Sequence, residues 1–411
     1  MSQEVVAVLY SVGTPMIFVI IYIITVVLRF LAPFMDKKRI MRREIKPLSL
    51  LCAILFAGCG ITPTGEDGVR KIACDEFNMA EGIQDKVSSV EYLVLDLPQG
   101  CVLGGMDKVI VSESGIYVGD YQSQKIFVFD TDGKMRSVLD RRGRGPGEYV
   151  QIQSFSVDKG KIYVLDQFEM KVLTYEAETL EYLRMDKSPV PAWDFCALHD
   201  DGFLFAYAPM EGNPVQDRTR QYRVVVTDKN MHIRDRYYPY AKDEVDAARI
   251  APYLSENADV VVYGSFREDG LSLFDRNDGC EKESLVFNFT KPIPDGERSF
   301  IKDIMEGGYT FLTSVPHRCG NYYAINLSVK GQGQLCVYDM AEAQVGQQSK
   351  GTMRNMLLGI IGGDGSCLIG NWRDKSIYEY MTGKGFKRAE PEEEAAILAG
   401  TPFLVFYRMQ E

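Results

Sequence analysis

The sequence holds few of the residues from which catalytic and metal sites are usually built. It has three His and two Trp among 411 residues. The three His, at positions 199, 232 and 317, are far apart in the chain, so a His-rich metal centre is poorly supported. We expect His317 to lie in a loop as a solvated or capping side chain. No Gly-x-Ser-x-Gly, P-loop or HExxH motif occurs.

Beyond its first 58 residues, which include a basic run at Lys37–Lys46, the sequence also lacks a basic stripe. The net charge is −11, and the first 58 residues hold seven basic and three acidic side chains, so the remainder carries −15. Phosphate contacts need clustered Lys and Arg, and the small cluster at Arg141, Arg142 and Arg144 does not reverse this balance. We therefore expect no nucleic-acid partner.

Cysteine is present without any metal-binding spacing. Two of the nine Cys lie at positions 52 and 59 of the apolar N-terminal region, and no two of the other seven are closer than 17 residues, which excludes a CxxC or zinc pattern. An odd number cannot all pair. We expect most to be small buried hydrophobic residues, with one or two disulfides left open.

A repeat organises the rest of the chain. Ile116–Asp120 and Ile126–Phe129 read as strands, Asp130–Gly133 as a turn, and Met135–Leu139 as a third strand. Seven residues of this unit are followed, 46 positions later, by a residue of the same chemical class. They are Ile116, Tyr117, Val118, Asp120, Lys125, Phe129 and Asp130. A period of about 40–50 residues with several strands per unit is typical of a β-propeller.

Looser copies follow. The second strand of each unit ends in an aromatic or Thr followed by an acidic residue at Thr227, Phe274 and Tyr338, and we place the end of the last copy at Tyr380. Six units result. The long step between Phe274 and Tyr338 predicts an extra loop or helix near residues 292–308.

The unit resembles an NHL repeat. Gly143-Arg144-Gly145-Pro146-Gly147-Glu148-Tyr149 matches the tail of that pattern, and the region from about Val90 onward resembles the bacterial six-bladed β-propeller lipoproteins, relatives of NHL and TolB-like propellers. The resemblance implies an all-β fold of six four-stranded antiparallel blades.

Both ends of the propeller read as hydrophobic strands. Val90–Leu97 precedes the first full unit, and Phe403–Met409 ends the chain. Free hydrophobic edges aggregate, so we predict that the two strands share one blade and close the ring. Glu392–Leu398, after Pro391, reads as a short helix.

The N-terminal region reads as a membrane-targeting segment. Val5–Leu28 is uncharged and long enough to span a bilayer, and a 12-residue apolar segment ending in Leu-Phe-Ala-Gly before Cys59 resembles a lipobox. In this interpretation Cys59 carries the lipid, and Gly60 after it favours export to the outer membrane. The first segment is either an over-extended gene start, with translation beginning at Met35 or Met41, or a true transmembrane helix.

These features divide the chain into four parts. They are an apolar extension over 1–40, a signal peptide over 41–58, a tether over 59–87 and a propeller over 88–411.

Three groups of side chains are candidate binding residues. Asp120, Asp166 and Asn371 occupy equivalent turns, where they either ring the central channel and hold a cation such as calcium, or cap their own turns. Arg141 and Arg144 either bind an acidic group or pair within a structural loop. Trp193 either stacks on a sugar or packs between blades.

The sequence favours a non-enzymatic envelope lipoprotein, anchored in the membrane through lipid on Cys59, whose propeller binds a protein or glycan partner. No cofactor is indicated beyond the calcium hypothesis. The alternative is a metal-dependent lactonase or lyase with its site in the central channel. Propellers host both kinds of function, so the fold does not separate them.

The N-terminal interpretation predicts the mature terminus. Mass spectrometry of the protein from its native membranes should find a first peptide that begins at lipidated Cys59. A precursor peptide from before Met35 would contradict the late translation start, and an unmodified Cys59 inside a longer peptide would contradict lipidation.

Overall fold

The computed structural model describes residues 69–207, 222–240, 252–265, 269–294, 304, 306–349, 353–372 and 374–410. The predicted lipidation site, Cys59, and the apolar segments before it lie outside these residues. None of the helices within the described ranges is long and apolar enough to cross a membrane.

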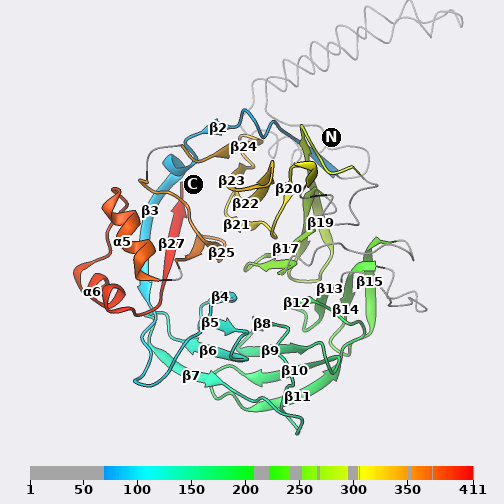
Figure 1. Cartoon of the computed structure of the whole chain (residues 1–411). Helices are drawn as coiled ribbons and strands as arrows, with labels where there is room; N and C mark the ends of the chain where they lie inside the picture. The colour runs from blue at the N-terminus through cyan, green and yellow to red at the C-terminus, as the bar shows by residue number, and fades with distance from the viewer. Residues whose placement is uncertain are drawn as a thin grey trace, which may run out of the picture. The chain divides into compact units, whose positions relative to one another are not determined.

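Six β-sheets stand around a common axis, as the prediction of a six-bladed propeller requires (Figure 1). The first two blades follow the predicted units: β4 (Lys108–Ser112), β5 (Gly115–Asp120), β6 (Lys125–Phe129) and β7 (Met135–Leu139), then β8 (Ser154–Asp158), β9 (Lys161–Asp166), β10 (Lys171–Glu176) and β11 (Tyr182–Lys187). The 46-residue offset is confirmed, because β9 begins 46 residues after β5 and β10 begins 46 residues after β6.

The middle blades repeat this antiparallel order. The third consists of β12 (Asp194–Ala197), β13 (Phe203–Ala206), β14 (Tyr222–Thr227) and β15 (Ile233–Pro239), and the fourth of β16 (Leu254–Glu256), β17 (Val260–Ser265), β18 (Gly270–Asp275) and β19 (Glu281–Phe289). The fifth contains β20 (Phe311–Leu312), β21 (His317–Cys319), β22 (Tyr322–Val329), β23 (Gln332–Asp339) and β24 (Gln344–Gln347). The extra element predicted near residues 292–308 falls largely outside the described residues.

The segment predicted as a tether is instead partly built into the ring. β1 (Val69–Cys74) adds a parallel strand to the outer edge of β19, and β2 (Ala80–Glu81) does the same at β24. A short 3₁₀ helix, Ile83–Lys86, then leads into β3 (Val87–Val94). The tether prediction is therefore wrong from Val69 onward, because the alternating burial of Ile72 and Cys74 fits a strand and not a solvated linker.

Strands from both ends of the chain close the ring in the sixth blade. Its order is β25 (Ile360–Gly363), β26 (Cys367–Asn371), β27 (Phe403–Met409) and β3, with β27 antiparallel to both neighbours. The predicted closure is confirmed. Figure 1 shows β27 and β3 side by side, although they come from opposite ends of the described chain.

Two helices separate β26 from β27. They are α5 (Lys375–Gly383) and α6 (Pro391–Ala399), and α6 is the predicted helix after Pro391. The placement of Tyr380 at the end of a strand is wrong, because Tyr380 lies in α5 and is 58% exposed. Asp374 starts that helix by accepting hydrogen bonds from the backbone N–H of Ser376 and Ile377.

The glycine-rich tail of the first unit forms a structural corner between the first two blades. The hydroxyl of Tyr149 donates to the carbonyl of Gln124 at 2.9 Å and accepts from the backbone N–H of Arg141 at 3.1 Å. Gly147 has a φ of +74°, and a Cβ there would lie 2.7 Å from the Tyr182 ring. The motif is thus explained by packing of the corner.

Closure predicts that the C-terminal strand stabilises all six blades. A chain ending at Thr401 loses β27 and should lose cooperative urea unfolding, as followed by circular dichroism. Tyr407→Phe is a milder test, since the Tyr407 hydroxyl accepts from the buried Trp372 Nε1 at 2.9 Å. Its loss should cost about 1–3 kcal/mol of unfolding free energy.

Tyr380→Phe is the matched control for this pair, because Tyr380 is exposed. It should change the unfolding free energy by less than about 0.5 kcal/mol. Equal effects of the two substitutions would contradict the role assigned to the closing strand.

Candidate functional site

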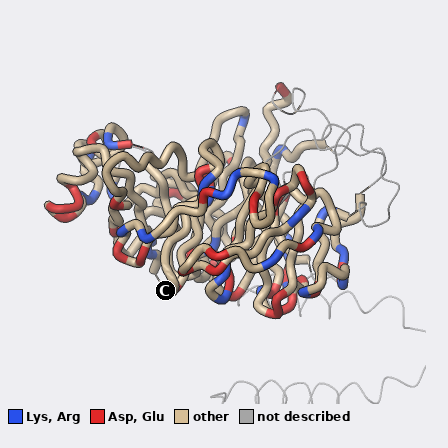
Figure 2. Tube along the Cα trace, turned by 90° about the horizontal axis from the view of Figure 1, so that it is seen from below, with Lys and Arg blue, Asp and Glu red and all other residues tan. Residues whose placement is uncertain are grey.

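The inner strands of the blades surround the central channel. β12 packs against β8 and β16, and β25 packs against β4, β16 and β21. The channel is the place where side chains from all blades can meet, so the candidate site is built from it. Figure 2 shows that Lys, Arg, Asp and Glu are interleaved along the trace, without a stripe of one sign.

Four charged side chains from three blades meet in this channel. Lys108 at the start of β4 has its Nζ 3.1 Å from Glu256 Oε1 and 3.7 Å from Asp194 Oδ1. Arg276, directly after β18, places Nη2 3.0 Å from Glu256 Oε2. All four side chains are buried, and the most exposed of them, Lys108, reaches 8%. We call Lys108, Asp194, Glu256 and Arg276 the channel cluster.

Two serine hydroxyls also donate hydrogen bonds to the carboxylates of the channel cluster. Ser154 donates to Asp194 Oδ1 at 2.6 Å, and Ser156 donates to Glu256 Oε2 at 2.7 Å. Burial by itself would raise the pKa of Glu256, but the charges of Lys108 and Arg276 outweigh it and hold that pKa below its usual range. The cluster is electrically neutral and ties the third and fourth blades to the first.

The candidate aspartates cap their own turns. Asp120 is fully buried and accepts hydrogen bonds from the backbone N–H of Gly104 at 2.8 Å and of Ser123 at 3.0 Å. Burial would raise the pKa of Asp120, yet these N–H groups hold it below its usual range. Asp166 accepts in the same way, from the backbone N–H of Val150 at 2.8 Å and of Glu169, in its own turn, at 3.2 Å. The structure therefore favours the turn-capping interpretation of both residues.

Calcium gains no support from these turns. Within the described ranges, no group of three or more His, Cys, Asp and Glu is placed to hold a metal ion. The carboxylates that do reach the channel, Asp194 and Glu256, are neutralised by Lys108 and Arg276.

The other candidates are not brought together. Arg144 is 72% exposed, and its Nη1 lies 3.9 Å from Glu169 Oε1 of the next blade, which fits the structural-loop interpretation. The backbone of Arg141 belongs to the Tyr149 corner. Trp193 is half-buried against the aromatic pair Tyr207 and Tyr240, which favours packing over sugar stacking.

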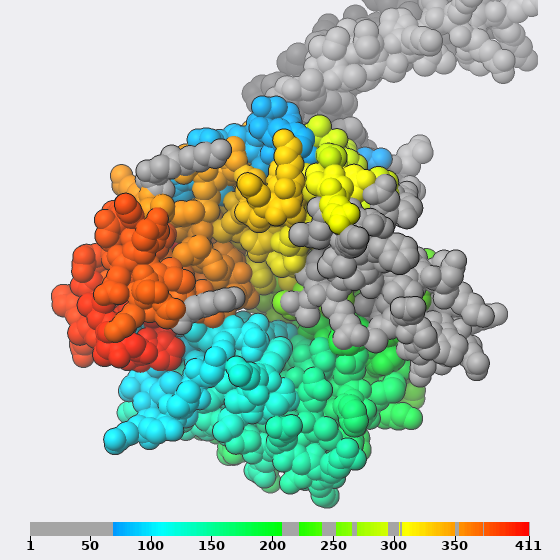
Figure 3. Space-filling view, viewed as in Figure 1, coloured from blue at the N-terminus to red at the C-terminus, as the bar shows by residue number. Residues whose placement is uncertain are grey.

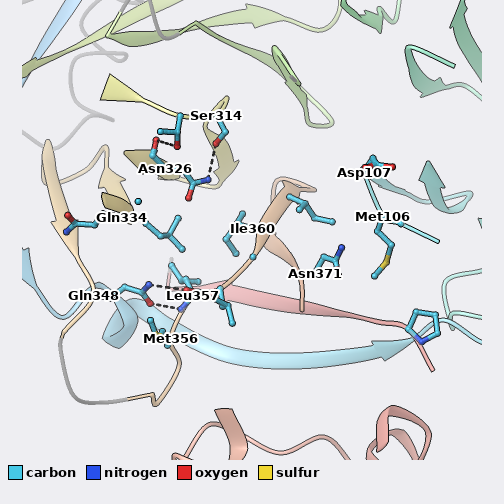
Figure 4. Close-up of a pocket in the computed structure, with 18 of the residues that line it drawn as sticks. Met106, Asp107, Ser314, Asn326, Gln334, Gln348, Met356, Leu357, Ile360 and Asn371 are labelled. Carbon is cyan, nitrogen blue, oxygen red and sulfur yellow. Dashed lines mark hydrogen bonds between the residues drawn. The ribbon is translucent and has the colours of Figure 1, made fainter. Parts of the chain in front are cut away.

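One pocket lies between the fifth, sixth and first blades. It has a volume of about 780 Å³, and we call it the amide pocket after the Asn and Gln side chains in its wall (Figure 4). The face in Figure 3 is hollowed where the yellow, orange and cyan segments meet. Asn371, at the end of β26, lines this pocket, so one of the candidate residues does reach a cavity.

Hydrogen bonds fix the amide pocket's wall. Gln348 holds Leu357 from both sides, accepting from its N–H at 2.6 Å and donating to its carbonyl at 3.0 Å. Asn326 Nδ2 donates to Ser314 Oγ at 2.9 Å. Asp107 is the one charged side chain among the described lining residues, and its Oδ2 accepts from the backbone N–H of Tyr121 at 2.8 Å. The wall is therefore rigid and nearly uncharged.

A second pocket of about 550 Å³ adjoins the channel cluster, because two members of that cluster, Glu256 and Arg276, also line the pocket. We call it the mouth pocket. Its wall comes from the ends of β4, β8 and β16, from His199 after β12, and from the β25–β26 turn. The side chains in it are mostly polar, among them Asp158 and Asn257.

His317 is not the loop residue that we predicted. It lies on β21, is 5% exposed, and places Nδ1 2.9 Å from Ser255 Oγ. Burial lowers the pKa of His317 to about 4, because the charged imidazolium would be desolvated there. The imidazole is consequently neutral at pH 7.

All seven described cysteines are free, and five of them are buried: Cys74, Cys196, Cys319, Cys336 and Cys367. This agrees with their interpretation as small hydrophobic residues.

Sequence reasoning missed the channel cluster. Its members are spread along the chain from Lys108 to Arg276, and the fourth copy of the repeat is too loose to align Glu256 with Asp194. One signal existed in principle, because charged residues at the start of a strand that is otherwise apolar, such as Lys108 before Val109, indicate a buried partner.

Fold and channel together define a six-bladed β-propeller closed by its two termini. The chain belongs to the family described as "6-bladed beta-propeller", DUF5128, whose model matches residues 64–295.

Among solved structures, a Bacteroides fragilis protein described as exported has the same fold, with a TM-score of 0.65 and 16% identity over 84% of this chain and 100% of that one. Similarity to other structures is weaker. A DUF4221 family member from Bacteroides vulgatus has a TM-score of 0.44 and 11% identity over 79% and 97%. BamB from Moraxella catarrhalis has a TM-score of 0.37 and 13% identity over 70% and 73%. Among curated proteins, no sequence matches this chain.

The neutral His317 predicts an acid-sensitive fold. Its pKa is about 4 in the folded chain, below the ordinary 6.5, so the unfolded chain takes up the proton first and stability falls as the pH drops from 6.5 to 4. The loss reaches about 3 kcal/mol at its limit. His317→Asn keeps a polar atom near Ser255 and should remove this part of the pH dependence in urea titrations.

His232→Asn is the matched control, because the His232 side chain is 79% exposed. The fall in stability that is assigned to His317 between pH 6.5 and 4 should persist in this variant. An unchanged slope in the His317 variant would show that the imidazole does not carry the effect.

Proposed function

We propose that this propeller is a non-enzymatic binding module that holds an uncharged, extended segment of a partner protein in the amide pocket. The observation that carries this proposal is the pocket's chemistry. Among its described lining residues, only Asp107 is charged and none is aromatic. Pockets with an apolar wall and a few fixed polar groups bind ligands by shape and hydrogen bonding.

The polar groups that the wall leaves open suit the N–H groups of a peptide main chain. Asn326 Nδ2 is used on Ser314 and Gln334 Nε2 donates to Gln347 Oε1 at 2.6 Å, which leaves the side-chain oxygens of Asn326 and Gln334 as acceptors. Gln334 and Asn371 stand on opposite sides of the pocket in Figure 4, with Ile360 between them. Met106 and Met356 add flexible apolar surface, which adapts to different side chains.

A glycan fits this pocket less well than a peptide. A sugar needs polar partners for its many hydroxyls, whereas much of this wall consists of Leu, Ile and Met side chains, and Trp193 does not line it. The lactonase or lyase alternative has less support still, because the channel carboxylates are held by Lys108 and Arg276.

The proposed setting is the cell envelope. The lipobox-like segment before Cys59 supports a lipid anchor, and Gly60 supports placement in the outer membrane. The similarity of the Gly143–Tyr149 tail to NHL repeats supports a relation to the propeller lipoproteins. In this setting lipid on Cys59 keeps the propeller at the membrane, where its partner is captured.

A filled pocket tests the proposal. Gly333 lines the amide pocket, has an ordinary φ, and a Cβ built there has no heavy atom within 4 Å. Gly333→Trp can therefore add bulk at the pocket wall without a clash. Affinity capture of the tagged full-length protein from its native membranes, followed by mass spectrometry, should retain a stoichiometric partner with the wild type and lose at least about 90% of it with the variant.

Gly383→Trp is the matched control. Gly383 ends α5, does not line the amide pocket, and has the same open space around its Cβ. This variant should retain the partner, and both variants should unfold at the wild-type temperature. A partner that is retained equally by both variants would place the binding surface outside the amide pocket.

A further inference from the structure

The mouth pocket contains buried polar atoms that the fold itself leaves without partners. Asp158 is 6% exposed and Asn257 is 2% exposed. Asp158 Oδ2 and both amide atoms of Asn257, Oδ1 and Nδ2, have no hydrogen-bond partner in the described chain, and both residues line the pocket. Each buried, unpaired polar group costs about 1–3 kcal/mol, so three such atoms at one cavity call for an occupant.

The surrounding contacts hold these two side chains in place. Asp158 uses its other oxygen, Oδ1, which lies 2.7 Å from His199 Nδ1. The backbone of Asn257 is fixed at both ends, with its N–H donating to Val260 at 2.9 Å and its carbonyl accepting from Arg276 Nη1 at 2.6 Å. The atoms that remain without a partner are therefore Asp158 Oδ2 and the side-chain amide of Asn257.

One guanidinium keeps the two residues close together. Arg276 Nη2 donates to the carbonyl of Val157, the residue before Asp158, at 2.8 Å, while Nη1 of the same side chain holds Asn257. The guanidinium is planar and itself paired with Glu256 in the channel cluster. Arg276 thus fixes the backbone of Asn257 relative to that of Val157, the residue next to Asp158.

The hydrogen-bonding character of these atoms selects the ligand class. Asp158 Oδ2 only accepts, which disfavours an anion, and Asn257 Nδ2 only donates, so a cation held by Asp158 Oδ2 and Asn257 Oδ1 would leave Nδ2 unpaired. A hydroxyl both donates and accepts, so two neighbouring hydroxyls can satisfy all three atoms. We infer that the mouth pocket binds the vicinal hydroxyls of a neutral sugar, at a site separate from the amide pocket.

The rest of the wall fits this ligand. Ser112, Ser114 and Ser366 bring further hydroxyls to the pocket, and Glu113 and Asp364 keep its wall unfavourable for anions. Because the free atoms are shielded from solvent, a sugar hydroxyl that reaches them competes with no bulk water. Because these atoms are closed to solvent in this structure, a sugar reaches them only if part of the wall moves.

The first test is sugar binding by the full-length chain in a detergent without a sugar headgroup, such as lauryldimethylamine oxide. Saturation-transfer NMR with glucose, galactose, mannose and N-acetylglucosamine should show transfer to at least one of them. Asn257→Leu and Asp158→Asn should each weaken that binding by at least about tenfold. Absence of transfer to all four sugars, or equal binding by Asn257→Leu, would overturn the inference.

A stability measurement separates ligand binding from a structural role. Leu has nearly the shape of Asn and no unpaired polar atom, so Asn257→Leu should unfold at the same or a higher temperature than the wild type. A lower unfolding temperature would show that the amide supports the fold, for example through a trapped water, and would overturn the inference. Stabilisation of the wild type by calcium chloride in place of sugar would overturn it as well.

Two controls complete the design. Asn230→Leu makes the same chemical change on the exposed turn after β14 and should leave sugar binding intact. Gly333→Trp alters the amide pocket and should also leave sugar binding intact. Failure of the proposed protein-binding function and failure of this inference therefore give different results.

Discussion

The pairing of β27 with both β26 and β3 is the constraint on which the rest of the structure depends. Without β27 and β3 the sixth blade would keep only two strands and expose a hydrophobic edge, and these two strands come from opposite ends of the described chain. In the core of this blade, the indole N–H of Trp372, after β26, donates a hydrogen bond to the hydroxyl of Tyr407 on β27. The N-terminal segment then continues the closure outward, because β1 and β2 lie along the fourth and fifth blades.

The channel cluster makes the closed ring rigid and also shapes its chemistry. Lys108 and Arg276 both form ion pairs with Glu256. The carboxylates that a metal-dependent enzyme would need are therefore already paired inside the protein. Function is thereby directed to the pockets near the channel. The amide pocket is nearly uncharged and suits a peptide, whereas the mouth pocket has spare donors and acceptors and suits hydroxyl groups.

Local patterns predicted the blades where the repeat is strong. Ile116–Asp120 and its copy in the next unit form β5 and β9, and the hydrophobic terminal strand forms β27. The same approach failed at Tyr380, where alternating aromatic residues imitate a strand although Asp374 caps a helix. It also failed at Val69–Cys74, because this short strand pairs in parallel with β19, a partner that lies three blades further along the chain than the first full unit.

The sequence by itself determined the fold class, the closure of the ring and the acidic net charge, because strand periodicity, repeat length and charge are local or additive properties. The tertiary structure alone decided the site. For Asp120 the sequence left a channel ligand and a turn cap open, and its hydrogen bonds are those of a cap, whereas His317 looked like a loop residue but lies buried in an inner strand. Lys108 meets Glu256, and Arg276 sets the positions of Asp158 and Asn257, through contacts across the ring axis that no local pattern encodes.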